Sequence, residues 1–234
     1  MIDSYLGEMM KKIRPYSIQY QALKHPISSV QIQLGDTIVL CSVTVEEKIP
    51  HWLKGQGKGW VTAEYGMLPT ATHDRTAREA KLGKQTGRSQ EIQRLIGRSL
   101  RAGIDLTKLG ERMITVDCDV IQADGGTRCA AITGGFLALE AAFQQMVETG
   151  QLPESPVIER IAAISVGILE DQVVLDLDYK ADVACSVDMN VVMTQSGRYV
   201  EIQATGEEAT FTPVQLQSML QAAADGIGQL FDAS

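Results

Sequence analysis

Apolar and polar residues alternate near the middle of the chain. Val116, Cys118 and Val120 are separated by aspartates, and an isoleucine follows. A period of two is typical of a strand that buries one face. The run ends in QADGG, whose Gly125 and Gly126 suit a turn with positive φ. A strand that runs into a tight glycine turn is therefore predicted here.

A long stretch of small and apolar residues follows this turn. It runs from Thr127 to Glu148 and includes AAITGGFLALEAAF. This length and composition predict a helix that packs closely against a sheet and is largely buried. Gly150 is the residue type expected just past a helix end.

The rest of the chain contains strands and helices in alternating groups. A helix is predicted from Ser89, as N-cap, to Ile104, because apolar residues recur there at helical spacing. Another should begin after Thr212 and Pro213, which suit the N-cap and the first helical position. This order predicts an α/β fold with mixed sheet pairing, in one domain over residues 1–234, because no linker-like stretch appears. Strands are predicted at 17–21, 29–34, 37–45, 59–68, 160–170, 172–178, 186–192 and 198–206.

Composition fits a soluble globular protein. The 234 residues are 44% hydrophobic, which is enough for a substantial core. No apolar run approaches the roughly 18 residues of a membrane span, and the N-terminus lacks the pattern of a signal peptide, so no membrane partner is expected. Four widely spaced cysteines predict reduced, mostly buried thiols in a cytoplasmic protein: Cys41, Cys118, Cys129 and Cys185.

Charge is distributed unevenly along the chain. Residues 70–101 carry eight Lys or Arg and three acids, a net charge of +5. Because the whole chain has a formal net charge of -8, the remainder carries -13. One concentrated basic surface on an acidic protein suits the binding of a nucleic-acid backbone. No Lys or Arg follows Arg198, so the C-terminal region should face away from the nucleic acid.

The glycine turn also has the chemistry of an anion site. A helix that starts at Thr127 directs unpaired N–H groups and the positive end of its dipole toward the turn. Arg128 can add two charge-assisted hydrogen bonds to a phosphate or carboxylate. An ordinary strand-to-helix connection explains the same residues, and for this motif alone it is the favoured interpretation.

Four blocks of the sequence, taken together, resemble the ribonuclease PH family. They are GKGWVTAEYGMLPTATH at 57–73, GRSQEIQRLIGRSLRA at 87–102, VDCDVIQADGGTR at 116–128 and VDMNVVMT at 187–194. The family comprises phosphate-dependent exoribonucleases that trim the 3′ ends of tRNA precursors, and the resemblance covers nearly the whole chain. It implies a duplicated βαβα fold with mixed sheets and packed helices, and a homohexameric ring built as a trimer of dimers.

The resemblance also implies where inorganic phosphate and a metal bind. Asp182 and Asp188 match an aspartate pair associated with catalysis and metal, and Asp178 is a third metal candidate. Mg²⁺ is the expected ion, since it needs only one or two carboxylates and keeps several waters. A solvated acidic turn is the alternative, although Asp188 lies in an apolar strand where an unpaired carboxylate is costly. The phosphate co-substrate is expected at Arg88, Gly126, Thr127 and Arg128.

The segment from Pro69 to Gly87 carries basic residues at every third position. These would line one side of a helix, whereas composition alone allows a solvated charged loop equally well. The resemblance favours an arm that contacts tRNA. It also shows two departures from the family: Leu82 stands where relatives generally have a basic residue, and Leu6-Gly7-Glu8 stands where they have a Gly-Arg pair, so no contact is assigned there. The predicted RNA-binding residues are Arg75, Arg78, Lys81 and Lys84.

The predicted reaction is phosphorolysis at an RNA 3′ end, with reverse nucleotide addition also expected. Its substrates are tRNA precursors and other structured RNA, and its products are nucleoside diphosphates. A hydrolytic, metal-dependent exonuclease is one alternative, but it leaves GGTR and Arg88 without a purpose. A non-catalytic RNA-binding ring subunit is the other; the presence of both the anion-binding residues and the aspartates counts against it.

Overall fold

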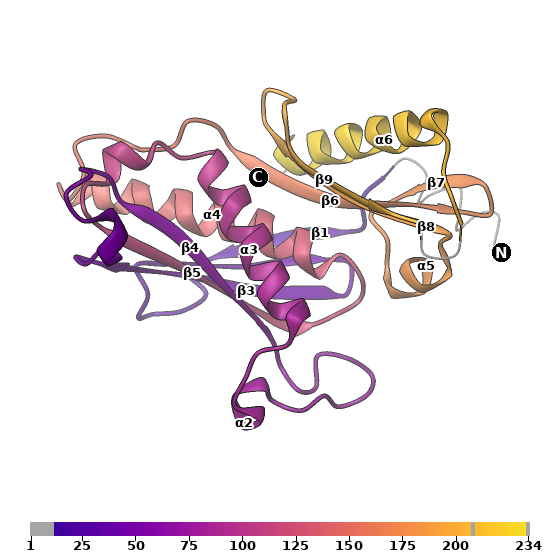
Figure 1. The fold of residues 1–234 in the computed structure, drawn as a ribbon, viewed down its shortest axis with the longest axis horizontal. Coiled ribbons are helices and arrows are strands. Elements are labelled where there is room, and N and C mark those ends of the chain that lie inside the picture. Colours follow the sequence, from indigo (N-terminus) through magenta and orange to yellow (C-terminus); the bar gives the residue numbers. More distant parts are fainter. Residues whose placement is uncertain (1–11, 207–208, 233–234) are drawn as a thin grey trace.

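The computed structural model describes residues 12–206 and 209–232. Its two β-sheets both contact one long helix, α4 (Thr127–Glu148) (Figure 1). The first sheet has five strands in the order β1-β2-β3-β5-β4. These are β1 (Tyr16–Tyr20), β2 (Ser28–Leu34), β3 (Thr37–Glu46), β4 (Trp60–Met67) and β5 (Met113–Gln122).

Pairing within the first sheet is mixed, as predicted. Four of its strands pair antiparallel, and a short 3-10 turn, η1 (His51–Leu53), lies between β3 and β4. β4 and β5 run parallel. A parallel pair requires a crossover connection, which is formed by α2 (Glu79–Leu82), α3 (Gly87–Ala102) and the 3-10 turn η2 (Leu106–Leu109). Helix α3 packs on β4 and thereby covers this edge of the sheet.

The second sheet has the strand order β7-β6-β8-β9 and is antiparallel throughout. Its strands β6 (Ile161–Leu169) and β7 (Gln172–Leu175) form the predicted hairpin. Glu170 and Asp171 between them both have positive φ. α5 (Tyr179–Ala184) leads into β8 (Val187–Thr194) and β9 (Tyr199–Thr205), and α6 (Pro213–Asp232) covers the sheet (Figure 1). Each half of the chain thus forms a sheet covered by helices, and the predicted α/β fold is confirmed.

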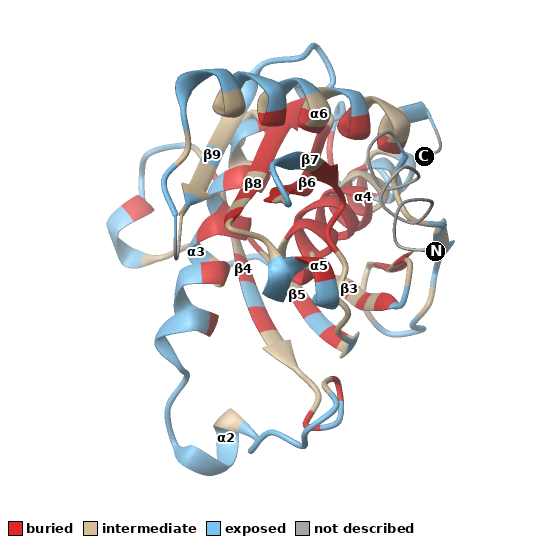
Figure 2. Cartoon of the chain, turned by 90° about the vertical axis from the view of Figure 1, so that its right-hand side faces the viewer, coloured by how far each residue is buried: buried red, intermediate tan, exposed pale blue. Residues whose placement is uncertain are grey.

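Helix α4 is buried around most of its circumference because it contacts both sheets (Figure 2). Its small residues permit this close packing. A Cβ added to Gly134 would lie 2.6 Å from Cγ2 of Ile32 on β2. The same core contains the inward face of β5, where Val116, Cys118 and Val120 are fully buried. The predicted strand and buried helix are both confirmed, with α4 beginning and ending at the predicted residues.

The four cysteines are free thiols, three of them buried and Cys185 partly exposed. This agrees with the expected reduced state. Across the described ranges, no helix is both long enough and apolar enough to cross a membrane.

Helix α3 begins earlier than predicted, and the prediction of Ser89 as its N-cap was wrong. Thr86 is the N-cap, and its Oγ1 accepts the N–H of Ser89 at 3.2 Å. The Oγ of Ser89 instead donates to Glu79 of α2 at 2.6 Å, and Glu79 also accepts the N–H of Thr86 at 3.1 Å. Glu79 thus completes the cap from another helix. Arg88 consequently lies within the first turn of α3.

Residues 69–86, called the arm below, extend away from both sheets (Figure 1) and are mostly exposed (Figure 2). Only the four residues of α2 are helical in this segment. The basic side chains therefore do not line one continuous helix face. All four predicted RNA-binding residues are exposed: Arg75, Arg78, Lys81 and Lys84. Leu82 is also exposed, at 57%.

Candidate active site

A cavity of about 490 Å³ opens where the glycine turn before α4, the start of α3 and the segment from α5 to β8 meet. Both halves of the duplicated fold contribute to its lining. Tertiary structure therefore unites groups that are far apart in sequence. The predicted site residues that line it are Arg88, Gly126, Thr127, Arg128, Asp182 and Asp188.

The glycine turn itself requires glycine at both positions. Gly125 and Gly126 have φ of +71° and +65°, a left-handed conformation that L side chains rarely adopt. A Cβ at Gly125 would also clash with the backbone carbonyl of Leu177. The turn is therefore packed directly against the segment that leads into α5 and Asp182. Gly126 is the N-cap of α4 and has no side chain to satisfy the first N–H groups of that helix, so these are suited to an anion.

A buried ion pair supports the turn from behind. Asp176 is only 2% exposed and accepts hydrogen bonds from Nε and Nη2 of Arg14 at 3.0 and 2.8 Å. Arg14 also donates to the backbone carbonyl of Asp124. Thr37 accepts the N–H of Asp124 at 2.9 Å and donates to the carbonyl of Gly125 at 2.6 Å. These contacts hold the turn to β3, to the residues just before β1 and to the residue that follows β7.

This ion pair was not among the contacts predicted from the sequence. One signal was present, because Asp176 follows the apolar run VVL, where a lone carboxylate needs a partner. Nothing in the local sequence shows that this partner is Arg14, however.

The Leu6-Gly7-Glu8 stretch, where relatives have a Gly-Arg pair, lies outside the described residues.

Thr127 is held by a tyrosine that the sequence reasoning also missed. The hydroxyls of Tyr65 and Thr127 lie 2.9 Å apart, and both residues are buried. Burial raises the pKa of the Tyr65 phenol, while its hydrogen bond to Thr127 and the nearby charges of Arg88 and Arg128 act to lower that pKa. The charges of Arg88 and Arg128 thus both act on the pKa of this buried phenol.

Arg128 is oriented by the second sheet and by α3. Its Nη1 donates to Oε1 of Gln203 on β9 at 2.9 Å, and Nε2 of Gln203 donates to Glu91 on α3 at 2.9 Å. This chain of hydrogen bonds limits the rotamers of Arg128. Arg88 is exposed in the first turn of α3, one turn before Glu91. The starts of two helices and two guanidinium groups thus contribute to the cavity lining.

Oxygen-containing side chains also line the cavity. Asp188 and Asn190 project from the same face of β8, and Asp182 lies on α5. Asp178 does not line this cavity; its Oδ1 accepts the N–H of Ala181 at 2.8 Å and caps α5. Among the residues described, no group of three or more acidic, His or Cys side chains is arranged to hold a metal. Mg²⁺ needs only one or two protein carboxylates, so Asp182 and Asp188 are the members of the predicted metal set that line the cavity.

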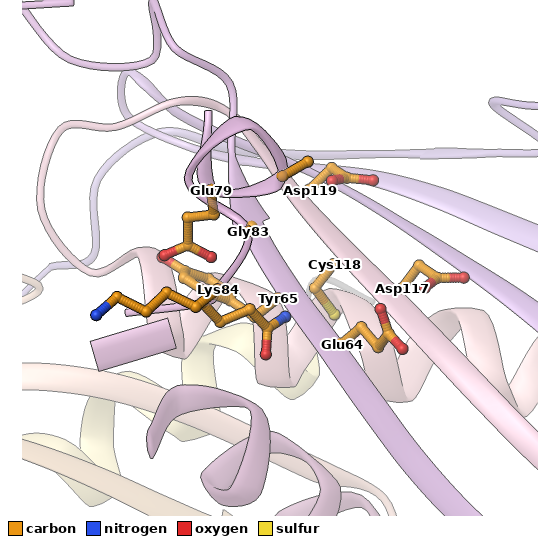
Figure 3. A pocket seen from close by; sticks show the side chains of 11 residues that line it. Glu64, Tyr65, Glu79, Gly83, Lys84, Asp117, Cys118 and Asp119 are labelled. Carbon is orange, nitrogen blue, oxygen red and sulfur yellow. The ribbon is translucent and has the colours of Figure 1, made fainter. Parts of the chain in front are cut away.

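A second cleft, of about 600 Å³, lies between the arm and the outer face of the first sheet. Figure 3 shows its acidic floor, where Glu64 and Asp117 are side by side on the parallel strands β4 and β5. Lys84 also lines the cleft, but its ammonium group points away from this pair (Figure 3). Partial burial raises the pKa of Asp117, and the charges of Glu64 and Asp119 raise it further. The ionised form of Asp117 is therefore disfavoured in the folded protein.

Asp117→Asn is expected to raise the Tm at pH 7 by about 1–3 °C, because it removes this unfavourable charge. A raised folded-state pKa means that the folded protein loses stability as pH rises from the ordinary carboxyl pKa, about 3.9, through the folded value. The gain should therefore be complete at neutral pH and disappear below about pH 4. Thermal unfolding across this range checks it, with Asp74→Asn on the exposed arm as control. A gain that persists in acid would contradict the charge explanation.

The fold and the first cavity together define an enzyme class. The cavity contains an anion cradle, formed by the glycine turn and the first N–H groups of α4, together with two arginines and two aspartates. An exposed basic arm lies beside it. These groups suit phosphoryl transfer on a polyanionic substrate. The chain belongs to the 3′ exoribonuclease family: residues 12–143 match the model of its domain 1, and residues 159–226 match that of its domain 2.

Individual relatives agree with this assignment. The chain is 55% identical over 227 residues to "Ribonuclease PH" of Bacillus cytotoxicus, covering 97% of this chain and 93% of that protein. "Ribonuclease PH" of Bacillus cereus strain AH187 matches with the same identity and coverage. The chain is accordingly a phosphate-dependent 3′ exoribonuclease and nucleotidyltransferase of the ribonuclease PH type, as its sequence blocks indicated.

Solved structures share the fold at low sequence identity. The RNA-bound exosome of Archaeoglobus fulgidus superposes with a TM-score of 0.78 at 17% identity, covering 94% of this chain and 88% of that one. Rice (Oryza sativa) Rrp46 has a TM-score of 0.74 at 20% identity, with coverage of 92% and 90%. The α/β architecture with two sheets is therefore shared with these proteins.

Proposed function

We propose that this enzyme removes the nucleotides beyond the mature 3′ end of tRNA precursors in the cytoplasm. Inorganic phosphate is the nucleophile, and nucleoside diphosphates are released. One observation carries the assignment of the site: a single cavity brings the two arginines at the starts of α3 and α4 together with Asp182 and Asp188. Resemblance to ribonuclease PH supports tRNA as the substrate and a homohexameric ring as the assembly.

In this proposal, Arg88, Arg128 and the backbone N–H groups of Gly126 and Thr127 hold the attacking phosphate. The positive groups offset its charge, so that it can approach the negatively charged terminal phosphodiester. An oxygen of the phosphate forms a bond to phosphorus, and the bond from phosphorus to the 3′ oxygen of the preceding nucleotide breaks. That oxygen takes up a proton and leaves as the 3′ hydroxyl of the shortened RNA. Positioning and charge neutralisation account for most catalysis of this kind.

Asp182 and Asp188 line the same cavity as the arginines and would either hold Mg²⁺ or manage the proton of the leaving oxygen. Mg²⁺, when bound, would neutralise negative charge on the phosphoryl oxygens. The exposed arm would contact the RNA backbone through its basic side chains. Its contribution should weaken with rising salt, since phosphate contacts release counterions.

Digestion of a tRNA that carries a few extra 3′ nucleotides tests the proposal directly. The reaction contains Mg²⁺ and is run with and without inorganic phosphate, and the released nucleotides are separated by chromatography. Nucleoside diphosphates that appear only with phosphate are the expected result. Monophosphates in both reactions would identify a hydrolytic exonuclease, and binding without release would identify a non-catalytic subunit. A tRNA that ends at the mature 3′ end is the matched control.

Arg128→Ala is expected to raise the KM for inorganic phosphate by about ten- to a hundredfold, because charge-assisted hydrogen bonds contribute about 1.5–3 kcal/mol. KM for RNA should change much less. Initial rates over a range of phosphate concentrations check this, and Arg94→Ala is the control because Arg94 is exposed on α3 and does not line the cavity. An unchanged KM for inorganic phosphate in Arg128→Ala would show that Arg128 does not bind the phosphate.

A further inference from the structure

An aromatic pair borders the phosphate cavity on the side of the arm. Tyr179 is the first residue of α5 and lines the cavity, yet its side chain is 52% exposed. His73 of the arm lies opposite, with ring centroids 6.3 Å apart and planes inclined by 57°. Val183, one turn along α5, also lines the cavity and is 69% exposed. None of these side chains has a role in the phosphate chemistry described above.

The position of Tyr179 is fixed by the same turn that forms the phosphate site. Its backbone N–H donates to Oδ1 of Asp124 at 3.3 Å, and Asp178 beside it caps α5. The ring is thus mounted on a supported backbone at the cavity edge. His73 follows Thr72, which lines the cavity, and precedes the first basic residue of the arm, Arg75, by two positions. The aromatic pair therefore lies at the cavity edge, close in sequence to the basic residues of the arm.

We propose that Tyr179 and His73 form a stacking platform for a nucleobase near the 3′ end of the RNA. This inference rests on the proposed function, because it requires a strand that reaches from the cavity to the arm. The phosphates of such an RNA strand would be neutralised by the arginines of the cavity at one end and by the basic residues of the arm at the other. Its bases would then pass the exposed rings of Tyr179 and His73. Aromatic stacking tolerates any base, which suits an enzyme that removes successive nucleotides irrespective of identity. Val183 extends the apolar surface toward the cavity.

Phosphorolysis of a short single-stranded oligoribonucleotide, at saturating phosphate, tests this platform. Tyr179→Ala is expected to raise the KM for the oligonucleotide by about tenfold, the scale of stacking one base on an aromatic side chain. KM for phosphate should stay the same, and Tyr179→Phe, which keeps the ring, should remain within about twofold of the unmodified protein. His73→Ala should have a smaller effect in the same direction. Tyr20→Ala is the matched control, because Tyr20 is similarly exposed at 48% but lies on β1 away from this cavity.

An oligonucleotide whose last 3′ nucleotides lack bases separates stacking from a general disturbance of α5. On this substrate the unmodified protein and Tyr179→Ala should have equal KM values. A tenfold difference that persists without bases would overturn the proposal, as would an unchanged KM on the normal oligonucleotide. If Tyr179→Ala instead alters the oligomeric state in light scattering and leaves the KM for RNA unchanged, the ring contacts a second copy and the platform is excluded.

Phosphorolysis by the unmodified protein tests the proposed function separately from the stacking platform. Absence of phosphate-dependent diphosphate release would overturn the proposed function alone. Fluorescence anisotropy of the labelled oligonucleotide would then still test the platform, with a tenfold weaker binding by Tyr179→Ala supporting it and equal binding overturning it.

Discussion

Asp188→Asn is expected to lower turnover by about 10³-fold, whether Asp188 holds Mg²⁺ or transfers a proton, because an amide binds a cation weakly and does not exchange a proton near neutral pH. The substitution keeps the size of the side chain at a half-buried position of β8. Binding of tRNA should be retained, since the basic arm is intact and removing a negative charge does not weaken attraction to a polyanion. Single-turnover rates and tRNA binding, measured on the same preparation, check both parts.

The matched control for Asp188→Asn is Asp171→Asn. Asp171 lies in the β6–β7 hairpin with φ of +62°, a conformation that asparagine also tolerates. It should keep normal turnover and binding. A near-normal rate for Asp188→Asn would remove this carboxylate from the reaction, and an equal loss of rate and tRNA binding would indicate a purely structural role.

Arg14→Ala is expected to lower the free energy of unfolding by about 3–5 kcal/mol, the usual cost of leaving one member of a buried ion pair without its partner. Asp176 is 2% exposed and takes two side-chain hydrogen bonds from Arg14. Burial acts to lower the pKa of the guanidinium, but the hydrogen bond and charge of Asp176 offset this and raise that pKa overall. The folded structure thus favours the charged form of Arg14. Urea unfolding monitored by circular dichroism measures the loss.

Arg98→Ala is the control for this prediction. Arg98 also pairs with a carboxylate, Glu201, at 2.7 Å, but its side chain is 58% exposed. Such a surface pair contributes about 0–1 kcal/mol. The double variant Arg14→Ala with Asp176→Asn should lose less unfolding free energy than the sum of the losses in the two single variants. Each single variant leaves one buried charge unpaired, whereas the double variant removes both charges. A loss below about 1 kcal/mol for Arg14→Ala would contradict the importance of the buried pair.

Local patterns predicted the main elements well because those elements follow simple periods. β5 alternates at a period of two, and α4 is rich in small and apolar residues over most of its length. The start of α3 was misplaced for a tertiary reason: Glu79 of α2 binds the Ser89 hydroxyl and leaves Thr86 to cap the helix. A side chain that is satisfied from another helix cannot be recognised from its own neighbourhood.

The sequence by itself determined the strand–turn–helix of the anion cradle, the concentration of positive charge in residues 70–101 and the family, because each depends on the order of nearby residues. Only the tertiary structure brought Arg88, Arg128 and Asp188 into one cavity. It also assigned supporting roles to Arg14 behind the turn and to Gln203 beside Arg128. Hydrogen bonds and ion pairs act over a few ångströms in space, so partners from distant strands and helices become apparent only once the two sheets have packed on α4.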